Sequence, residues 1–253
     1  MTRRRFFAPP SAFNSHQHAV VLAAEEARYL REILRLKIGD EVYVFNGEGK
    51  EFQCTVEESR RESARLNLVT EVAPARPESP LELTLAVALL KGDKFDLVVQ
   101  KVTELGVTRI VPVTTKLADV RLRDTSDAAK RGSRWQRIAL EAAKQSGRAV
   151  VPVVAEPVAF ESFVQTAAAD SSACLMFSER DGESLTQARE KLPANVSSIT
   201  ALVGSEGGWT DPELLAARDA GWLLVTLGGR TLRAETAGIA VIALLQHLFG
   251  DLR

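Results

Sequence analysis

The feature that most constrains the fold of this chain is a proline-rich segment at residues 74–80. Pro74, Pro77 and Pro80 lie within seven residues of one another. Proline fixes φ and lacks an amide donor, so this segment favours an extended connector over helix or sheet. A chain of 253 residues is long enough for two hydrophobic cores at about 100 to 200 residues per domain. We therefore predict two domains, residues 1–73 and 81–253, joined by a linker at 74–80.

Before the linker, the sequence has the pattern of a small β domain. Residues 41–45, 51–56 and 64–72 alternate or cluster β-forming side chains, and Asn46, Gly47 and Gly49 supply turns between the first two segments. One helix is expected over residues 24–34, where apolar side chains recur on one face. These features predict a small antiparallel sheet or barrel.

After the linker, predicted strands and helices alternate. Strands are expected over residues 81–90, 107–113, 150–154, 173–177, 199–203 and 222–227. Asp93 is placed to cap a helix that ends at Leu105 before Gly106, and a further helix is expected over residues 134–145. Such alternation predicts an α/β fold with a mostly parallel sheet covered on both faces.

The distribution of charge leaves the partner open. The formal net charge is −1, whereas a dedicated nucleic-acid binder usually carries a basic excess. Basic residues nevertheless outnumber acidic ones from Lys116 to Arg148, and the reverse holds from Ala149 onward. A basic binding face on a neutral molecule and an ordinary solvated face both fit this pattern.

Cysteine usage and hydropathy indicate the compartment. Cys54 and Cys174 are the two cysteines, and neither has histidine or cysteine neighbours at metal-binding spacing, so no metal is expected. Residues 1–7 lack the apolar core of a secretion signal, and the longest apolar stretch, 237–245, is shorter than the roughly 20 residues that span a bilayer. We predict a cytoplasmic protein without a membrane partner.

Two glycine-rich segments follow predicted strands, where ligands collect in open α/β sheets. The first, Val203-Gly-Ser-Glu-Gly-Gly208, runs into a helix that Thr210 or Asp211 starts; the second spans Leu227 to Ala237. Neither matches the dinucleotide fingerprint or the phosphate loop. Glycines let backbone amides approach a ligand closely, while Glu206 suits hydroxyl groups, amines or a cation rather than phosphate. The segments predict a small-molecule pocket and leave its ligand open, with a plain tight turn as the alternative.

These motifs resemble the two cofactor motifs of the 16S ribosomal RNA uracil-N3 methyltransferases of the SPOUT superfamily. Further similar segments are Lys91–Asp96, Lys101–Gly106, Glu141–Arg148 and Ile33–Asp40. Together the matches span nearly the whole chain in the family's order. Two positions depart from the family pattern, because Ser205 stands where a proline is usual and Tyr29 where a histidine is frequent.

The resemblance implies a SPOUT-type α/β knot, in which the carboxy-terminal domain forms a deep trefoil knot, and a PUA-like RNA-binding barrel at the amino terminus. It implies a homodimeric S-adenosyl-L-methionine-dependent methyltransferase without a metal. The enzyme would methylate N3 of a uridine in 16S rRNA, within the small ribosomal subunit, by direct transfer to a splayed-out base. A ribose methyltransferase, a noncatalytic RNA-binding factor and an ordinary nucleotide-binding enzyme are the alternatives.

The resemblance also implies roles for individual residues. The expected cofactor-binding residues are Phe177, Ser178, Val203, Gly204, Glu206, Gly207, Gly208, Leu227, Gly228, Leu232 and Thr236. Core packing is the alternative for Phe177, Leu227 and Leu232. Arg233 is the hypothetical catalytic cation that favours the deprotonated uracil, and the identity of a general base stays open. Candidates for RNA phosphates are Arg3, Arg4, Arg5, Arg35 and Arg148, each with a solvated surface role as the alternative.

Overall fold

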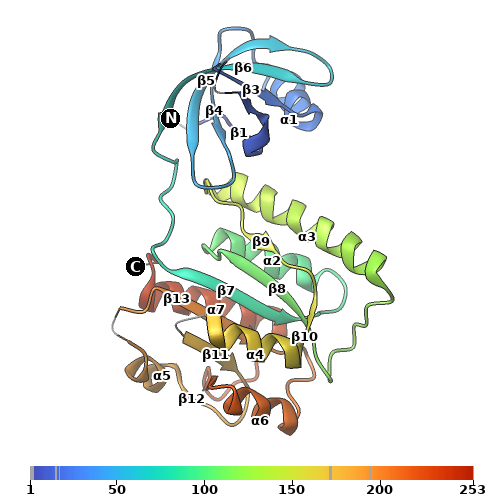
Figure 1. Cartoon of the computed structure of the whole chain (residues 1–253), viewed down its shortest axis with the longest axis vertical. Coiled ribbons are helices and arrows are strands. Elements are labelled where there is room, and N and C mark those ends of the chain that lie inside the picture. Colours follow the sequence, from blue (N-terminus) through green and yellow to red (C-terminus); the bar gives the residue numbers. More distant parts are fainter. Residues whose placement is uncertain (1–2, 15, 17, 171–172, 194, 253) are drawn as a thin grey trace. The chain divides into compact units, whose positions relative to one another are not determined.

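The computed structural model describes residues 3–14, 16, 18–170, 173–193 and 195–252. The chain forms two compact units (Figure 1). The first comprises Met1–Glu78 together with Ala143–Val151, and the second comprises Ser79–Ala142 and Pro152–Arg253. In the described part of the chain, no helix is both long and apolar enough to cross a membrane.

The first unit is built on a six-stranded sheet with the order β1-β4-β5-β6-β3-β2. Its strands are β1 (Arg5–Phe7), β2 (Phe13–Asn14), β3 (Ala19–Leu22), β4 (Glu41–Phe45), β5 (Glu51–Ser59) and β6 (Ala64–Val72). The three predicted strands are confirmed, with β5 three residues longer than expected. The pairing is antiparallel as predicted, except that β1 pairs with β4 in parallel.

The predicted helix of this unit is confirmed with a change of hydrogen-bond pattern. It begins as α1 (Ala24–Arg28) and continues as a π-helical turn over Tyr29–Ile33. There the Leu34 amide donates to the Tyr29 carbonyl at 3.0 Å. Leu30 is fully buried in a core that also contains Phe6 and Val44. A short 3-10 turn, Pro10–Ala12, lies between β1 and β2.

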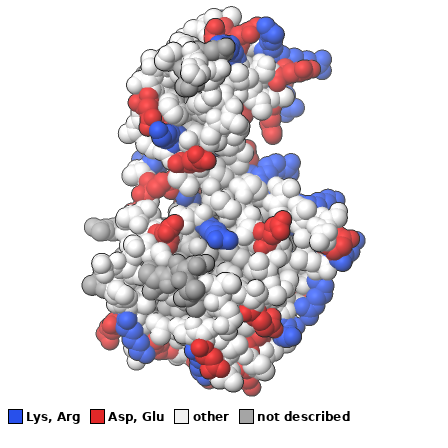
Figure 2. Space-filling model, in the orientation of Figure 1, with Lys and Arg blue, Asp and Glu red and all other residues white. Residues whose placement is uncertain are grey.

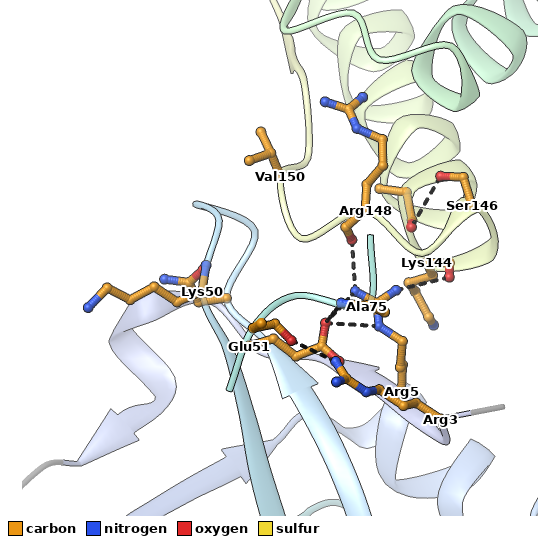
Figure 3. A network of polar contacts seen from close by, with 12 residues as sticks. Arg3, Arg5, Lys50, Glu51, Ala75, Lys144, Ser146, Arg148 and Val150 are labelled. Carbon is orange, nitrogen blue, oxygen red and sulfur yellow. Dashed lines mark hydrogen bonds and ion pairs between the residues drawn. The ribbon is translucent and has the colours of Figure 1, made fainter. Parts of the chain in front are cut away.

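A buried carboxylate organises the edge of this unit (Figure 3). The Glu51 side chain, at the start of β5, is 0% exposed and accepts hydrogen bonds from Arg3 Nη1 at 3.0 Å and Arg5 Nη2 at 3.1 Å. The Ala75 amide donates to the same carboxylate at 3.0 Å. The Arg5 guanidinium also lies over the Phe45 ring, 4.6 Å from its centroid. The proline-rich segment is thereby anchored to the start of β5.

Arg5 also binds the returning segment 143–151, which belongs to the same unit. Its Nη1 donates to the Lys144 carbonyl at 3.3 Å and its Nη2 to the Arg148 carbonyl at 2.9 Å (Figure 3). The Arg148 side chain in turn donates to Glu78 Oε2 through Nε at 2.9 Å and Nη2 at 2.7 Å. Arg148 is buried, so this ion pair is part of the interior of the unit.

The second unit contains a parallel sheet with the order β10-β8-β7-β13-β11-β14-β12, and β9 pairs with β8. Its strands are β7 (Glu82–Ala88), β8 (Arg109–Thr114), β9 (Val153–Val154), β10 (Val158–Ala159), β11 (Ala173–Phe177), β12 (Glu183–Ser184), β13 (Ser198–Val203) and β14 (Leu223–Thr226). Every pairing among them is parallel, which confirms the predicted α/β class.

Helices cover both faces of this sheet (Figure 1). They are α2 (Lys94–Glu104), α3 (Thr125–Ser146), α4 (Phe160–Asp170), α5 (Leu185–Lys191), α6 (Asp211–Asp219) and α7 (Ala234–Phe249). On one face α4 and α6 enclose a core that contains Ala86, Trp209 and Trp222. On the other face Gly238 of α7 packs near Val98 of α2. How the chain threads is not defined by strand order, so the trefoil knot stays a prediction.

Three local expectations for this unit were wrong in detail. Asp93 occupies the N-cap position of α2 without a capping hydrogen bond, and its carboxylate instead lies 3.4 Å from Arg134 Nη2. Helix α3 begins at Thr125, nine residues before the expected start at 134, where Asp127 pairs with Arg131 one turn later. The strand expected over 150–154 is reduced to β9, because Val150 forms bridges to residues 47 and 48 of the first unit's turn.

We expect Glu51→Gln to lower the free energy of unfolding by about 3 kcal/mol, because it removes the charge that compensates the nearly buried Arg5 guanidinium. Urea-induced unfolding measures this loss. The matched control is Glu57→Gln on the same strand, whose partner is Arg65 and whose side chain is 52% exposed. That exposed pair should contribute about 1 kcal/mol or less. Equal losses for both variants would contradict the organising role of Glu51.

Candidate functional site

A cleft opens at the carboxyl ends of three adjacent parallel strands, β13, β11 and β14. Its empty space is about 520 Å³, a figure that includes volume open to solvent. Its lining consists of Phe177, Ser178, Glu179, Val203, Gly204, Ser205, Gly208, Trp209, Thr226, Leu227, Gly228, Arg230, Leu232, Ala234 and Ala237. All of these residues belong to the second unit.

The first wall of the cleft is the glycine loop that follows β13. Trp209 fixes this loop, since its indole Nε1 donates to the Phe177 carbonyl at 2.8 Å while its ring is buried. A Cβ at Gly204 would lie 3.0 Å from that ring, and a Cβ at Gly208 would lie 2.6 Å from Glu179 Oε1. Gly208 also has φ +68°, a conformation that favours glycine. Close packing against the Trp209 ring therefore favours glycine at position 204, and the positive φ favours it at position 208.

The helix after this loop starts as the sequence predicts. Thr210 is the N-cap of α6, and its side chain and Glu213 form a reciprocal capping box. The buried Glu213 carboxylate also accepts from the Lys116 amide at 3.0 Å. The end of the glycine loop is thus tied to a neighbouring segment, which favours a fixed loop geometry.

The second wall is the loop between β14 and α7. Leu227, Gly228, Arg230 and Leu232 line the cleft from this loop. Arg233 occupies the N-cap position of α7 with extended backbone, makes no side-chain capping bond and is exposed. Ala234 and Ala237, in the first turn of α7, complete this wall.

The structure brings together most of the residues that the sequence nominated for a cofactor. Those that line the cleft are Phe177, Ser178, Val203, Gly204, Gly208, Leu227, Gly228 and Leu232. Glu206, Gly207 and Thr236 are not among the lining residues. A Cβ at Gly207 would lie 2.8 Å from Leu117 Cβ, so this glycine faces Leu117, and Thr236 is exposed on α7.

Several lining residues were not nominated for the cofactor from the sequence, among them Trp209, Glu179 and Arg230. Trp209 directly follows the glycine motif, so a large aromatic beside two glycines was the available signal. No local pattern identified Glu179, because it joins the site through the pairing of β11 between β13 and β14.

Glu206 is held by an ion pair outside the cleft. Lys94 Nζ lies 2.7 Å from Glu206 Oε1. Burial opposes ionisation of Glu206, but the hydrogen bond and charge of Lys94 outweigh it and place the pKa of Glu206 below its usual value. The same hydrogen bond raises the pKa of Lys94. Both groups are therefore charged at neutral pH.

Two other polar groups of this chain help to define the chemistry. Ser205 Oγ is buried and has no hydrogen-bond partner within the described residues, so the hydroxyl at this departure from the family pattern is unsatisfied. Burial raises the pKa of the Cys54 thiol to about 12, which keeps it protonated and unreactive. Among the described residues, no three His, Cys, Asp or Glu side chains are grouped to hold a metal ion.

The arginines nominated for RNA have different surroundings. Arg3 and Arg5 are paired with Glu51, and Arg148 is paired with Glu78. Arg4 and Arg35 are exposed, and their side chains have no ion-pair partner in the described part of the chain. On the face in Figure 2, basic and acidic groups are intermingled and form no large area of one sign.

Two family models match the chain. An RNA methyltransferase domain matches residues 77–246, which is more than half of the chain. An RNA methyltransferase PUA domain matches residues 22–69, within the first unit. The second match confirms the PUA-like character predicted for the amino-terminal domain.

Curated relatives match this chain over most of its length. Ribosomal RNA small subunit methyltransferase E from Synechocystis is 34% identical over 229 residues, which cover 90% of this chain and 73% of the relative. The protein of the same name from Bacillus subtilis is 30% identical over 231 residues, covering 89% of each.

Solved structures agree with the sequence comparisons. A ribosomal RNA small subunit methyltransferase E from Neisseria gonorrhoeae, bound to S-adenosyl methionine, superposes with a TM-score of 0.87 at 34% identity, covering 100% of both chains. A methyltransferase from Legionella pneumophila in complex with the same cofactor gives a TM-score of 0.88 at 29% identity, again covering 100% of both chains. The two glycine loops, the domain matches and these relatives together establish that the chain belongs to the ribosomal RNA small subunit methyltransferase E family.

Proposed function

We propose that this protein transfers a methyl group from S-adenosyl-L-methionine to N3 of a uracil base in 16S ribosomal RNA. The observation that carries the proposal is the cleft between the two glycine loops, in a chain whose similar solved relatives contain that cofactor. The base-and-atom specificity rests on the resemblance of the second loop, residues 227–237, to the uracil-N3 enzymes.

The residues of the cleft fit an S-adenosyl nucleoside. Phe177, Leu227 and Leu232 offer apolar surface for a flat base, and the unsatisfied Ser205 hydroxyl offers a polar contact. Gly204 packs against the Trp209 ring and Gly208 has a positive φ, so both positions favour glycine and leave backbone groups accessible on that wall. We propose that these loops, with Phe177 and Ser178 between them, hold the cofactor.

When bound, S-adenosylmethionine supplies an electrophilic methyl group on a positively charged sulfur. The protein's task is to hold the uracil N3 in line with that methyl and to stabilise its deprotonated form. Arg233 is the cation that we assign to the second task, because it is exposed at the N-cap of α7 beside residues that line the cleft. The protonated, buried Cys54 has no part in this direct transfer.

We place the RNA contacts on Arg4 and Arg35 rather than on all five nominated arginines. Arg3, Arg5 and Arg148 already have carboxylate partners, and separating those pairs would leave buried charge uncompensated. Both remaining arginines lie in the first unit, which contains the PUA match. A target base within folded RNA must be splayed out to expose its N3 edge.

We further propose that the enzyme is a cytoplasmic homodimer with a knotted carboxy-terminal domain and that it acts on the small ribosomal subunit. A calorimetric titration with S-adenosylmethionine separates this function from a noncatalytic RNA-binding factor and from an ordinary nucleotide-binding enzyme. Mass analysis of nucleosides from treated small subunits then separates base methylation from ribose methylation. Comparison of free 16S rRNA with purified subunits identifies the form of the substrate.

Gly208→Ala should weaken cofactor binding roughly tenfold, about 1.4 kcal/mol, as measured by calorimetry. The new methyl group combines an unfavourable φ of +68° with crowding against the Glu179 carboxylate in the cleft wall. Gly221→Ala is the matched control, since Gly221 has φ +84° and a Cβ added there would meet no atom within 4 Å. Equal cofactor affinity in the two variants would remove Gly208 from the site.

For Arg233→Ala we expect kcat to fall roughly 100-fold while the Kd for S-adenosylmethionine stays unchanged, because the lost cation acts on the transition state. Methyl transfer to small subunits and calorimetry provide the two readouts. Arg189→Ala, on the exposed surface of α5, serves as control. Full turnover by the Arg233 variant would exclude its catalytic role.

The double variant Arg4→Glu and Arg35→Glu should bind 16S rRNA more weakly and with a shallower salt dependence. Each lost phosphate contact is expected to reduce the slope of log K against log salt by about one. Filter binding over a series of salt concentrations measures both effects. The double variant Arg189→Glu and Arg218→Glu, at two exposed arginines of the second unit, controls for the same change of net charge. If it gave the same loss, Arg4 and Arg35 would have no special place in the footprint.

A further inference from the structure

Lys94 is the first residue of α2 and lies outside both glycine loops in the sequence, yet it reaches a residue of each. Its Nζ is 2.7 Å from Glu206 Oε1, in the loop after β13. The same nitrogen is 3.7 Å from Glu235 Oε2, in the first turn of α7. A single ammonium group therefore bridges two carboxylates from the two chain segments that form the walls of the cleft.

The two carboxylates adjoin the cleft without lining it. Ser205 and Gly208, on either side of Glu206, line the cleft, and so do Ala234 and Ala237 on either side of Glu235. Glu206 and Glu235 are absent from the lining itself. Each carboxylate thus belongs to a residue that is one or two positions from a residue lining the cleft. A shift of either carboxylate would therefore also move the wall that a cofactor contacts.

The charges make Lys94 necessary to this arrangement. Glu235 is 12% exposed, and its Oε2 is buried without a hydrogen-bond partner among the described residues. Lys94 is the cation that the described ion pairs place within 4 Å of it. Without that ammonium, Glu206 and Glu235 would be two uncompensated negative charges in neighbouring walls, and partly buried like charges repel.

We propose that Lys94 is a positioning residue that holds the two glycine loops at the separation required to bind S-adenosylmethionine. This inference rests on the proposed function of the cleft. Loss of the bridge lets the loops separate, so the cofactor has to order them when it binds, and that ordering cost lowers affinity. Once the cofactor is bound, the loops are in place and Lys94 has no further role in methyl transfer.

The test compares Lys94→Met with Lys94→Arg by calorimetric titration with S-adenosylmethionine. We expect roughly 5- to 50-fold weaker binding for Lys94→Met, within the roughly 5- to 150-fold range of typical coupling between sites, and substantial recovery for Lys94→Arg, which keeps the charge. In methyl-transfer assays, Lys94→Met should raise KM for the cofactor while kcat at saturating cofactor stays close to that of the unmodified protein. A merely structural residue would lower the folded fraction and kcat together.

A double-mutant cycle with Glu235→Gln identifies the partner. If Lys94 acts by linking the walls, Lys94→Met in the Glu235→Gln background should cost less affinity than it does alone. Lys191→Met is the matched control, because Lys191 is an exposed lysine of the same unit that is paired with Glu183. Should Lys94→Met fail to fold, Glu235→Gln alone tests the inference. We expect this variant to bind the cofactor more weakly than the unmodified protein does.

The outcomes separate this inference from the proposed function. If the unmodified protein bound no S-adenosylmethionine, the proposed function itself would fail. If the unmodified protein bound it and both Lys94→Met and Glu235→Gln bound it equally well, the positioning role would be overturned. Loss of kcat without a change in KM for Lys94→Met would also overturn it.

Discussion

The parallel pairing of β11 between β13 and β14 is the constraint on which the site depends. Parallel neighbours end at the same edge of a sheet, so the loops after β13 and β14 must emerge on either side of the end of β11. Phe177 and Ser178 fill the space between them, and the Trp209 indole ties the first loop to the Phe177 carbonyl. The cleft is therefore a consequence of strand order, with glycines where side chains would collide.

In the first unit, a network of charged groups links the sheet to the segments that pack against its edge. Glu51 collects two arginines and one backbone amide in a buried position, and Arg5 extends that network to the segment that returns after α3. Because arginine serves both internal ion pairs and RNA phosphates, the residue type alone did not distinguish these uses. The exposed Arg4 and the paired Arg5 are adjacent in sequence but have different surroundings.

Local patterns in the sequence predicted much of the fold. The strands over 41–45, 64–72 and 173–177 have the expected bounds, because β-branched and apolar runs there end at turn residues. The early start of α3 was missed because the stretch around Gly132 is polar and lacks a strong apolar period; its hydrogen bonds and its Asp127–Arg131 pair stabilise it nonetheless. Val150 was assigned to the wrong element because its partners, residues 47 and 48, lie far away in the sequence.

Local patterns also located part of the candidate site, as they did part of the fold. The glycine motifs located both walls of the cleft, since glycine reports on backbone geometry that is local. Glu179 lies outside both motifs, and so does Lys94. Lys94 lies 112 residues from Glu206, and their contact depends on how α2 packs beside α7 on one face of the sheet.

Hydrogen exchange of the protein with and without S-adenosylmethionine is the most direct test of the central claim that both glycine loops close around one cofactor. We expect amides of residues 203–209 and of residues 227–234 to become protected together, with the same dependence on cofactor concentration. Protection of one loop alone, or of neither at saturating cofactor, would contradict a shared site.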